Sequence, residues 1–186
     1  MGIYIVAMAA LFFLAFAYFA VGQASVTRGQ AQTAADAAAL AAARADRDAL
    51  RDDFLQAVTA GDVDALTGLL ANLGQHDAAA CAAAAGYADR NGAEIPPGGC
   101  VPADDGDGYT VTVRSRDAVG KSAVDGTEEI HAKATATAVV EPRCVVGPKE
   151  GQVLGFTCDH RDVTIDPTSA GFRLDLSTFY TVHLSQ

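Results

Sequence analysis

Apolar residues fill the first part of the chain and then give way to a regular pattern of alanines. The run IYIVAMAALFFLAFAYFAV, which begins at Ile3, contains no charge and no proline. At about 1.5 Å per residue, a helix of this length crosses a hydrocarbon layer of about 30 Å. Alanine is the best helix former, and the first proline is Pro96. The pattern predicts one helix from Ile3 to about Val58, a transmembrane helix over residues 1–22 that continues as an alanine-rich stalk over residues 23–60.

The alanines of the stalk recur at alternating steps of four and three residues, which is the spacing of helices packed side by side. A stripe of small side chains lets helix axes approach closely. We interpret this stripe as an assembly seam between neighbouring helices, formed by Ala31, Ala35, Ala38, Ala42, Ala45 and Ala49. The same register runs back through the apolar segment on Ala24, Val21, Ala17, Leu14, Ala10, Ala7 and Ile3. The alternative is that these alanines only favour a helix.

A second series of small residues lies at steps of seven along the same helix and consists of Ala15, Gly22 and Gly29. Spacing of this kind resembles the small-residue contacts of membrane helix pairs. It favours close helix association within the membrane as well as beyond it.

The long helix acquires a new apolar stripe near its end, and the two short helices that follow it are expected to form a collar. Leu50, Phe54 and Val58 recur at steps of four and predict an apolar stripe that docks on the rest of the domain. Gly61 is expected to end this helix, and Asp62 to cap the next one, which Gly74 closes. Residues 76–91 predict a third helix. Residues 92–108 are rich in Gly, Pro and Asp and mark the boundary between the helical part of the chain and the part expected to form strands.

From Tyr109 onward, apolar and polar residues alternate with the period of a β-strand. Residues 109–115 and 129–141 show the alternation most clearly, and the second segment places Ile130, Val140 and four alanines on one face. A strand face made of alanines favours a close helical neighbour. Further strands are expected at 152–158, 161–166, 172–176 and 177–184, with turns at 147–151 and 166–171. The prediction is an α+β fold, with an antiparallel sheet on a helical spine and one ectodomain over residues 61–186.

The four cysteines all follow the apolar run, at Cys81, Cys100, Cys144 and Cys158. An even number of cysteines without a CxxC pair favours disulfides in an oxidising compartment over a zinc site. Three connectivities are possible, and proximity in sequence favours Cys81 with Cys100 and Cys144 with Cys158. The domain beyond the apolar helix is therefore expected to lie outside the cytoplasm.

The charge of the chain argues against a nucleic-acid partner, and its N-terminal pattern leaves a signal peptide as the alternative to a membrane anchor. The 186 residues carry 13 Lys and Arg against 23 Asp and Glu, a net charge of −10, and no basic patch that a phosphate backbone would require. We therefore expect no nucleic-acid partner. The sequence GQA before Ser25 resembles a signal-peptide cleavage site, but the apolar run is longer than such peptides and no Lys or Arg precedes it. A retained membrane anchor in contact with lipid is favoured.

The apolar span followed by VGQASVTRGQAQTAADAAALAAARA resembles the N-terminal segment of TadE/TadG-like pilus assembly proteins of the tight-adherence system, particularly TadG-related actinobacterial members. The resemblance covers about the first 50 residues. It implies a minor-pilin-like or pseudopilin-like envelope protein with a pilin-like layout. It also implies an ectodomain outside the membrane and contacts with other copies or related pilin-like subunits in building a pilus.

Residues that carry catalysis or bind metals are sparse. His76, His131, His160 and His183 show no ligand spacing, and GKS at residues 120–122 lacks the rest of a phosphate loop. Asp159, His160, Asp162 and His183 would form a metal site only if their strands were adjacent. Asp104, Asp105 and Asp107, separated by Gly106, are weak candidates for Ca²⁺, because the twelve-residue loop pattern is missing. We therefore expect no enzyme and no cofactor.

Two functional classes remain after these exclusions. In the first, the protein is a structural component of a pilus or its assembly machinery and associates through its N-terminal helix. In the second, the acidic ectodomain is a membrane-tethered binding module that does not enter a filament. Small residues that continue across the membrane boundary favour the first class, because a simple tether has no need of them.

Overall fold

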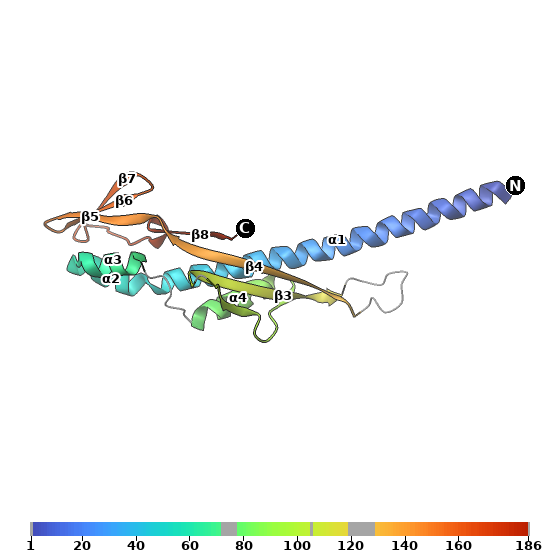
Figure 1. Ribbon diagram of the computed structural model, residues 1–186, viewed down its shortest axis with the longest axis horizontal. Helices are drawn as coiled ribbons and strands as arrows, with labels where there is room; N and C mark the ends of the chain where they lie inside the picture. Colours follow the sequence, from blue (N-terminus) through green and yellow to red (C-terminus); the bar gives the residue numbers. More distant parts are fainter. Residues whose placement is uncertain (1, 72–77, 105, 119–128, 186) are drawn as a thin grey trace.

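The structure is a computed structural model that describes residues 2–71, 78–104, 106–118 and 129–185. It has the predicted α+β class, with a long N-terminal helix that runs through the folded domain and projects far beyond it (Figure 1). The helices are α1 (Gly2–Ala49), α2 (Arg51–Ala60), α3 (Val63–Ala71), α4 (Ala78–Arg90) and the 3-10 helix η1 (Leu176–Thr178). The strands are β1 (Ala93–Glu94), β2 (Cys100–Pro102), β3 (Gly108–Ala118), β4 (His131–Pro142), β5 (Cys144–Glu150), β6 (Val153–Cys158), β7 (Arg161–Ile165) and β8 (Tyr180–Leu184).

The strands form two antiparallel sheets at different levels along the long axis. One sheet has the order β1-β3-β4-β8, with β2 also paired to β3, and the other has the order β5-β6-β7. The first sheet lies along the C-terminal half of α1, and the second lies near α2 and α3 at the end opposite the N-terminus (Figure 1). The two sheets therefore follow one another along the helices, the first against α1 and the second near α2 and α3.

The C-terminal half of α1 is sandwiched between α4 and the first sheet. Six of its alanines are fully buried, namely Ala34, Ala35, Ala38, Ala39, Ala42 and Ala43. Helix α4 presents its own buried alanines at steps of four, and β4 contributes Ala136 and Ala138 to the same core. Small side chains in all three layers let the backbones approach closely. This arrangement confirms the prediction that the alanine face of β4 packs on a helix.

The structure changes the interpretation of the assembly seam. Ala31, Ala35, Ala38 and Ala42 are at most 2% exposed, because the chain's own sheet and α4 cover them, whereas Ala45 is half-buried and Ala49 is exposed. The contact predicted between neighbouring helices is thus, at these four positions, a contact within one chain. Residues of α1 and α2 from Ala34 to Val58 also contribute to the hydrophobic core that the strands share.

The predicted single helix is interrupted at Leu50. The amide of Leu50 donates to the carbonyl of Arg47 at 3.2 Å, a tighter turn than an α-helix makes, and α2 begins at the next residue. Leu50, Phe54 and Val58 lie on one helical face across this interruption, and all three are buried as the stripe predicted. Phe54 lies 4.6 Å from Phe179, centroid to centroid.

The predicted helix boundaries at Gly61 and Asp62 are confirmed. Gly61 has a φ of 62°, and its amide donates to carbonyls of the last turn of α2. The carboxylate of Asp62 accepts a hydrogen bond from the amide of Ala65 at 2.9 Å and so caps α3. Gly74, expected to close this helix, lies outside the described residues.

Several strand predictions need correction. Residues 147–151 were expected to form a turn, but Gly147–Glu150 belong to β5 and the turn follows at Gly151. Residues 172–176 were expected to form a strand, yet they lead irregularly into η1, where the Asp175 carboxylate accepts from the Ser177 amide at 2.9 Å. The short strands β1 and β2 lie within residues 92–108, which the sequence marked only as a boundary. Pairing with β3 stabilises them, although the local sequence shows no strand alternation.

Both favoured disulfides are present. Cys81–Cys100 ties α4 to β2, and Cys144–Cys158 joins β5 to β6 at residues that lie directly opposite in the ladder. Each bridge closes a loop of fewer than twenty residues, with sequence separations of 19 and 14. The two bridges stabilise different parts of the molecule, one beside each sheet.

Replacing Ala38 with leucine is expected to lower the free energy of unfolding by about 1–3 kcal/mol, because the added carbons find no space between α4 and the sheet. Ala38 is fully buried. The measurement is urea denaturation of the full chain in detergent. The control is Ala49→Leu, at an exposed position of the same stripe, which should change stability by less than about 0.5 kcal/mol. Equal effects at the two positions would show that Ala38 is not enclosed as described.

Candidate functional site

The N-terminal half of α1 projects from the domain as an apolar rod without cover from the chain (Figure 1). Every described side chain from Gly2 to Val26 is exposed, and large residues such as Ile3, Phe13 and Tyr18 are 78%, 74% and 84% exposed. Residues Gly2–Phe19 are long and apolar enough to cross a membrane. Exposed apolar surface of this extent marks a site that lipid or protein covers.

The composition of α1 changes where it enters the domain. The apolar run ends at Val21, Arg28 is the first charged residue, and Ala31 is the first fully enclosed side chain, at 2% exposure. Ten residues of helix separate Val21 from Ala31, a rise of about 15 Å. The folded domain therefore begins about 15 Å along the helix from the apolar run, which is about twice the thickness of one headgroup layer.

The small residues of the projecting rod that the structure describes are left exposed by the rest of the chain. A side-chain carbon built at Gly22 or Gly29 would meet nothing within 4 Å, and Ala15 is exposed. The backward extension of the seam, through Ala10 and Ala17, is equally exposed. The chain thus covers the seam from Ala31 to Ala42 and leaves the described small residues of the rod exposed.

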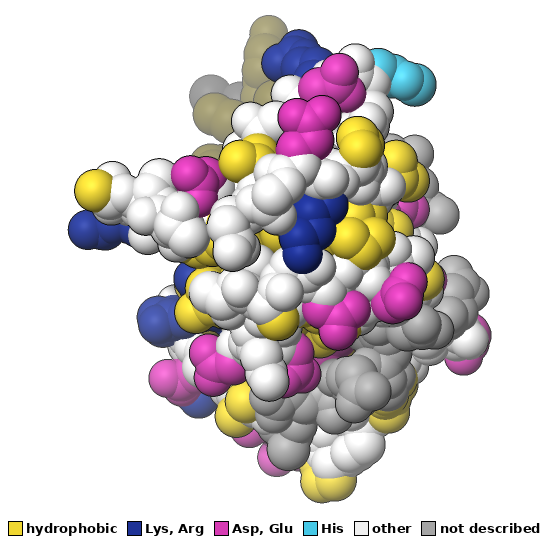
Figure 2. Space-filling view, turned by 90° about the vertical axis from the view of Figure 1, so that its left-hand side faces the viewer, with side chains coloured by type: hydrophobic (Ala, Val, Ile, Leu, Met, Phe, Trp, Pro, Cys, Tyr) yellow, Lys and Arg dark blue, Asp and Glu magenta, His cyan; other side chains and the backbone are white. Residues whose placement is uncertain are grey.

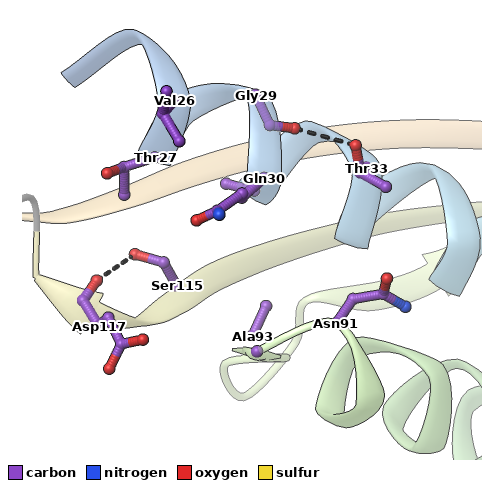
Figure 3. Close-up of a pocket in the computed structure, with 11 residues that line it drawn as sticks. Val26, Thr27, Gly29, Gln30, Thr33, Asn91, Ala93, Ser115 and Asp117 are labelled. Atoms are coloured by element: carbon purple, nitrogen blue, oxygen red, sulfur yellow. Dashed lines mark hydrogen bonds between the residues drawn. The ribbon is translucent and has the colours of Figure 1, made fainter. Parts of the chain in front are cut away.

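A pocket lies at the junction where α1 leaves the domain, and we call it the junction pocket (Figure 3). It has a volume of about 550 Å³ and lies between α1, the end of α4 and β3. Thr33 donates to the carbonyl of Gly29 at 3.1 Å, and Ser115 donates to the carbonyl of Asp117 at 2.8 Å. Figure 3 shows the side chain of Gln30 extending from α1 toward the space between the helix and β3. The described lining offers hydroxyl and amide groups and the carboxylate of Asp117, with no lysine or arginine, so it does not suit phosphate.

The metal and catalytic candidates from the sequence do not converge. Asp104 and Asp107 are exposed, and the carbonyl of Asp107 accepts from the amide of Val140 at 2.7 Å, so this loop leads into the sheet. Asp105, His76 and residues 120–122 lie outside the described residues. Among the residues that the structure describes, no three His, Cys, Asp or Glu side chains are grouped so that they could hold a metal ion.

Asp159 and His160 form the turn between β6 and β7, with positive φ values of 47° and 65°. The Arg143 guanidinium donates to the Asp159 carboxylate at 2.7 Å, and this hydrogen bond holds the pKa of Asp159 below its usual value. His183 lies instead on β8, where its ring nitrogen is 3.9 Å from Glu141. The arrangement is a set of exposed ion pairs and not a site with a shared centre.

The end of the domain farthest from the N-terminus carries charges of both signs. Figure 2 shows Lys and Arg side chains interspersed with Asp and Glu over this face. Lys149 reaches from β5 to the end of α2, where its ammonium group donates to the carbonyl of Gly61 at 2.9 Å. This contact stabilises a helix C-terminus, at which a cation is favoured. The described residues of this face therefore form no patch of basic side chains alone.

The comparison with known protein families bears on the projecting rod. Residues 1–45 match the family described as "Tad: Putative Flp pilus-assembly TadE/G-like". The N-terminal segment is TadE/G-like. The resemblance drawn from the sequence is confirmed for this segment, and it indicates involvement in pilus assembly. No curated protein and no solved structure matches the chain.

The TadE/G-like segment coincides with a physical unit of the structure. It includes the entire rod, the polar junction and the alanines that enter the core, and it ends at Ala45, shortly before the interruption at Leu50. A membrane-anchored protein fits both the family and the helix. The junction pocket was not predicted, because its lining comes from three distant segments and no local sequence pattern brings them together.

Proposed function

We propose that this protein is a membrane-anchored structural component of a Tad pilus or its assembly machinery, of the minor-pilin or pseudopilin kind. Its projecting rod associates with the helices of other copies or related subunits, and its acidic domain is displayed outside the membrane. The observation that carries the proposal is the coincidence of two features on the projecting rod: an apolar helix whose described side chains are all exposed, and the TadE/G-like match.

The two disulfides support the orientation. All four cysteines are paired, and each pair lies in the folded domain. Disulfides persist in oxidising compartments and are rare in the cytoplasm. The domain is therefore assigned to the extracytoplasmic side, with the rod as a single membrane span.

The position of the domain limits which residues take part in helix association. Ala35 and Ala42 are covered within the chain, so a neighbouring helix has no access to them. The contact that we propose uses the part of the seam on the rod, where Ala10 and Ala17 lie on the same face and are exposed. Small side chains there permit the close backbone approach on which helix association in membranes depends.

Cysteine crosslinking in native membranes tests this assignment. Because the four natural cysteines are bonded to each other, an introduced cysteine supplies a new thiol. With Ala10→Cys or Ala17→Cys, we expect oxidation to give disulfide-linked dimers or adducts with a related subunit. The matched control is Met8→Cys, which lies about 200° around the helix from Ala10 and should crosslink weakly.

The outcome separates the two functional classes. Crosslinks with a helical period support an assembly role. A rod that remains monomeric at every position, in cells that assemble pili, would favour the membrane-tethered binding module. Crosslinks with no dependence on the helix face would indicate random collision in the membrane and would also count against the proposal.

A further inference from the structure

The junction pocket combines a buried apolar floor with a polar rim. Ala31 of α1 and Ala93 of β1 line it and are 2% and 1% exposed, so they form its floor. Val26, which is 60% exposed, adds an apolar side chain where α1 leaves the domain, and the other lining side chains are polar. The volume of about 550 Å³ is within the range of small-molecule sites. The pocket therefore has room for a ring-shaped ligand with both apolar and polar surfaces.

Two hydroxyl groups on the rim already form hydrogen bonds within the chain. The Ser115 hydroxyl donates to the carbonyl of Asp117 at 2.8 Å and accepts from the amide of Ala132 at 2.9 Å. The Thr33 hydroxyl donates to the carbonyl of Gly29 at 3.1 Å. Because the chain itself satisfies these hydroxyls, they are not the groups for which a ligand is required.

Three other side chains on the rim keep hydrogen-bonding capacity that no described residue uses. The amide of Gln30 and the carboxylate of Asp117 have no side-chain partner in the described part of the chain. Asn91 donates to the carbonyl of Tyr87 at 2.8 Å, which leaves its amide oxygen as an acceptor. Figure 3 shows these three residues on α1, on β3 and just after α4. Groups from three parts of the chain thus surround one space.

The free groups favour a neutral ligand that is rich in hydroxyls. The amides donate and accept, and the carboxylate only accepts, so a ligand must supply several donors. A sugar ring supplies them, because each of its hydroxyls donates and accepts, and its C–H face can pack on the alanine floor. Asp117 disfavours an acidic ligand, since no lysine or arginine of the described lining balances a second negative charge.

The position of the pocket along α1 suits a group that extends beyond phospholipid headgroups. Val26 and Gln30 follow Val21, where the apolar run ends, by five and nine residues. These separations correspond to a rise of about 7.5 and 13.5 Å. One headgroup layer is about 5–7 Å thick. On an anchored chain the pocket therefore begins at the outer limit of this layer, which the headgroup of a glycolipid or a glycan outside the membrane can reach.

We propose that the junction pocket binds a neutral sugar unit, with its ring on Ala31 and Ala93 and its hydroxyls bonded to Gln30, Asn91 and Asp117. The sugar belongs either to a glycolipid headgroup or to a glycan outside the membrane, and the chemistry of recognition is the same. The inference goes beyond the proposed function, which concerns the helices of the rod. Only the glycolipid source rests on the membrane anchoring proposed there. The alternative is a pocket that holds only water.

Saturation-transfer NMR on the full chain in dodecylphosphocholine micelles, which contain no sugar, tests the proposal. The probes are the methyl glycosides of glucose, galactose and mannose, each paired with the methyl glycoside of its uronic acid. At least one neutral glycoside should bind with a dissociation constant in the millimolar range. Its uronic acid partner should bind at least about ten-fold more weakly, because a second carboxylate would lie near Asp117.

Two variants with matched controls locate the binding. Gln30→Leu should weaken binding at least about five-fold, because it removes a donor and an acceptor at nearly constant volume. Gln32→Leu is its control, since the Gln32 amide lies outside the pocket and donates to Asp36 at 2.8 Å. Asp117→Asn should abolish the discrimination against the uronic acid, whereas Asp104→Asn, away from the pocket, should not. All four substituted side chains are exposed, so each variant should retain the thermal transition of the parent.

Lipid nanodiscs identify the source of the sugar. If a glycosyl diacylglycerol with the preferred sugar lowers the apparent affinity for the free glycoside, relative to phosphatidylglycerol alone, the headgroup occupies the pocket by competition. Equal affinity assigns the pocket to a glycan outside the membrane. No saturation transfer from any neutral glycoside, equal binding of neutral and acidic sugars, or equal effects of Gln30→Leu and Gln32→Leu would each overturn the proposal. None of these results depends on helix association, so the proposed function is tested separately.

Discussion

Replacing Phe54 with alanine is expected to lower the free energy of unfolding by about 3–5 kcal/mol, the typical cost of deleting a buried aromatic side chain. Phe54 is fully buried where α2 meets both sheets. Its ring centroid lies 4.6 Å from that of Phe179 and 6.5 Å from that of Phe156, which belongs to β6. Tyr180, the first residue of β8, contacts the same ring edge-on at 6.2 Å. The substitution leaves a cavity at the place where the two sheets are held together.

Urea denaturation of the full chain in detergent, followed by tyrosine fluorescence, measures this effect. Leu55→Ala is the matched control, because Leu55 is the next residue of the same helix and is 38% exposed. It should cost no more than about 1 kcal/mol. A loss at Phe54 as small as the loss at Leu55 would show that the aromatic cluster does not join α2 to the sheets.

Removing the Cys81–Cys100 disulfide is expected to cost about 3 kcal/mol of unfolding free energy, the chain-entropy value for a loop of this size. The bridge spans 19 residues and ties α4 to β2. The bond restricts the unfolded chain, so its loss favours unfolding even if the folded structure is unchanged. The double variant Cys81→Ala/Cys100→Ala is required, because a single substitution would leave a free thiol.

Denaturation midpoints with and without a reducing agent give the measurement. The parental protein should lose stability when it is reduced, and the double variant should lose only the share contributed by Cys144–Cys158, which also closes a short loop. If the double variant unfolds at the same urea concentration as the parent, the first bridge does not contribute as described.

Sequence periodicity anticipated much of the fold where one residue type repeats along one face. The alternation in β4 predicted both the strand and its helical neighbour, because an alanine face can be buried only by a surface that approaches closely. Gly61 and Asp62 marked helix ends correctly, since their effects are local. The strand expected over residues 172–176 was wrong, because Asp175 caps a turn of 3-10 helix through a hydrogen bond that alternation does not register.

The assembly seam is the clearest case in which a pattern was recognised and its partner was not. Spacing of three and four residues shows that a helix face is buried, but it does not say against what. Here α4 and β4 supply small side chains of their own, so Ala35 and Ala38 are enclosed inside one molecule. The limited pairing of β8 with β4 likewise had no signal in the sequence, because it depends on the lengths of two strands that are far apart in the chain.

The sequence by itself determined the apolar rod, the TadE/G-like character of the first 45 residues, the α+β class and the favoured disulfide pairing. These features depend on composition and on contacts between residues close in the chain. Only the tertiary structure decided which alanines face the chain's own core, where the rod emerges and how far β8 pairs with β4. Such features depend on contacts between distant segments, whose free energy is not encoded in any one stretch of residues.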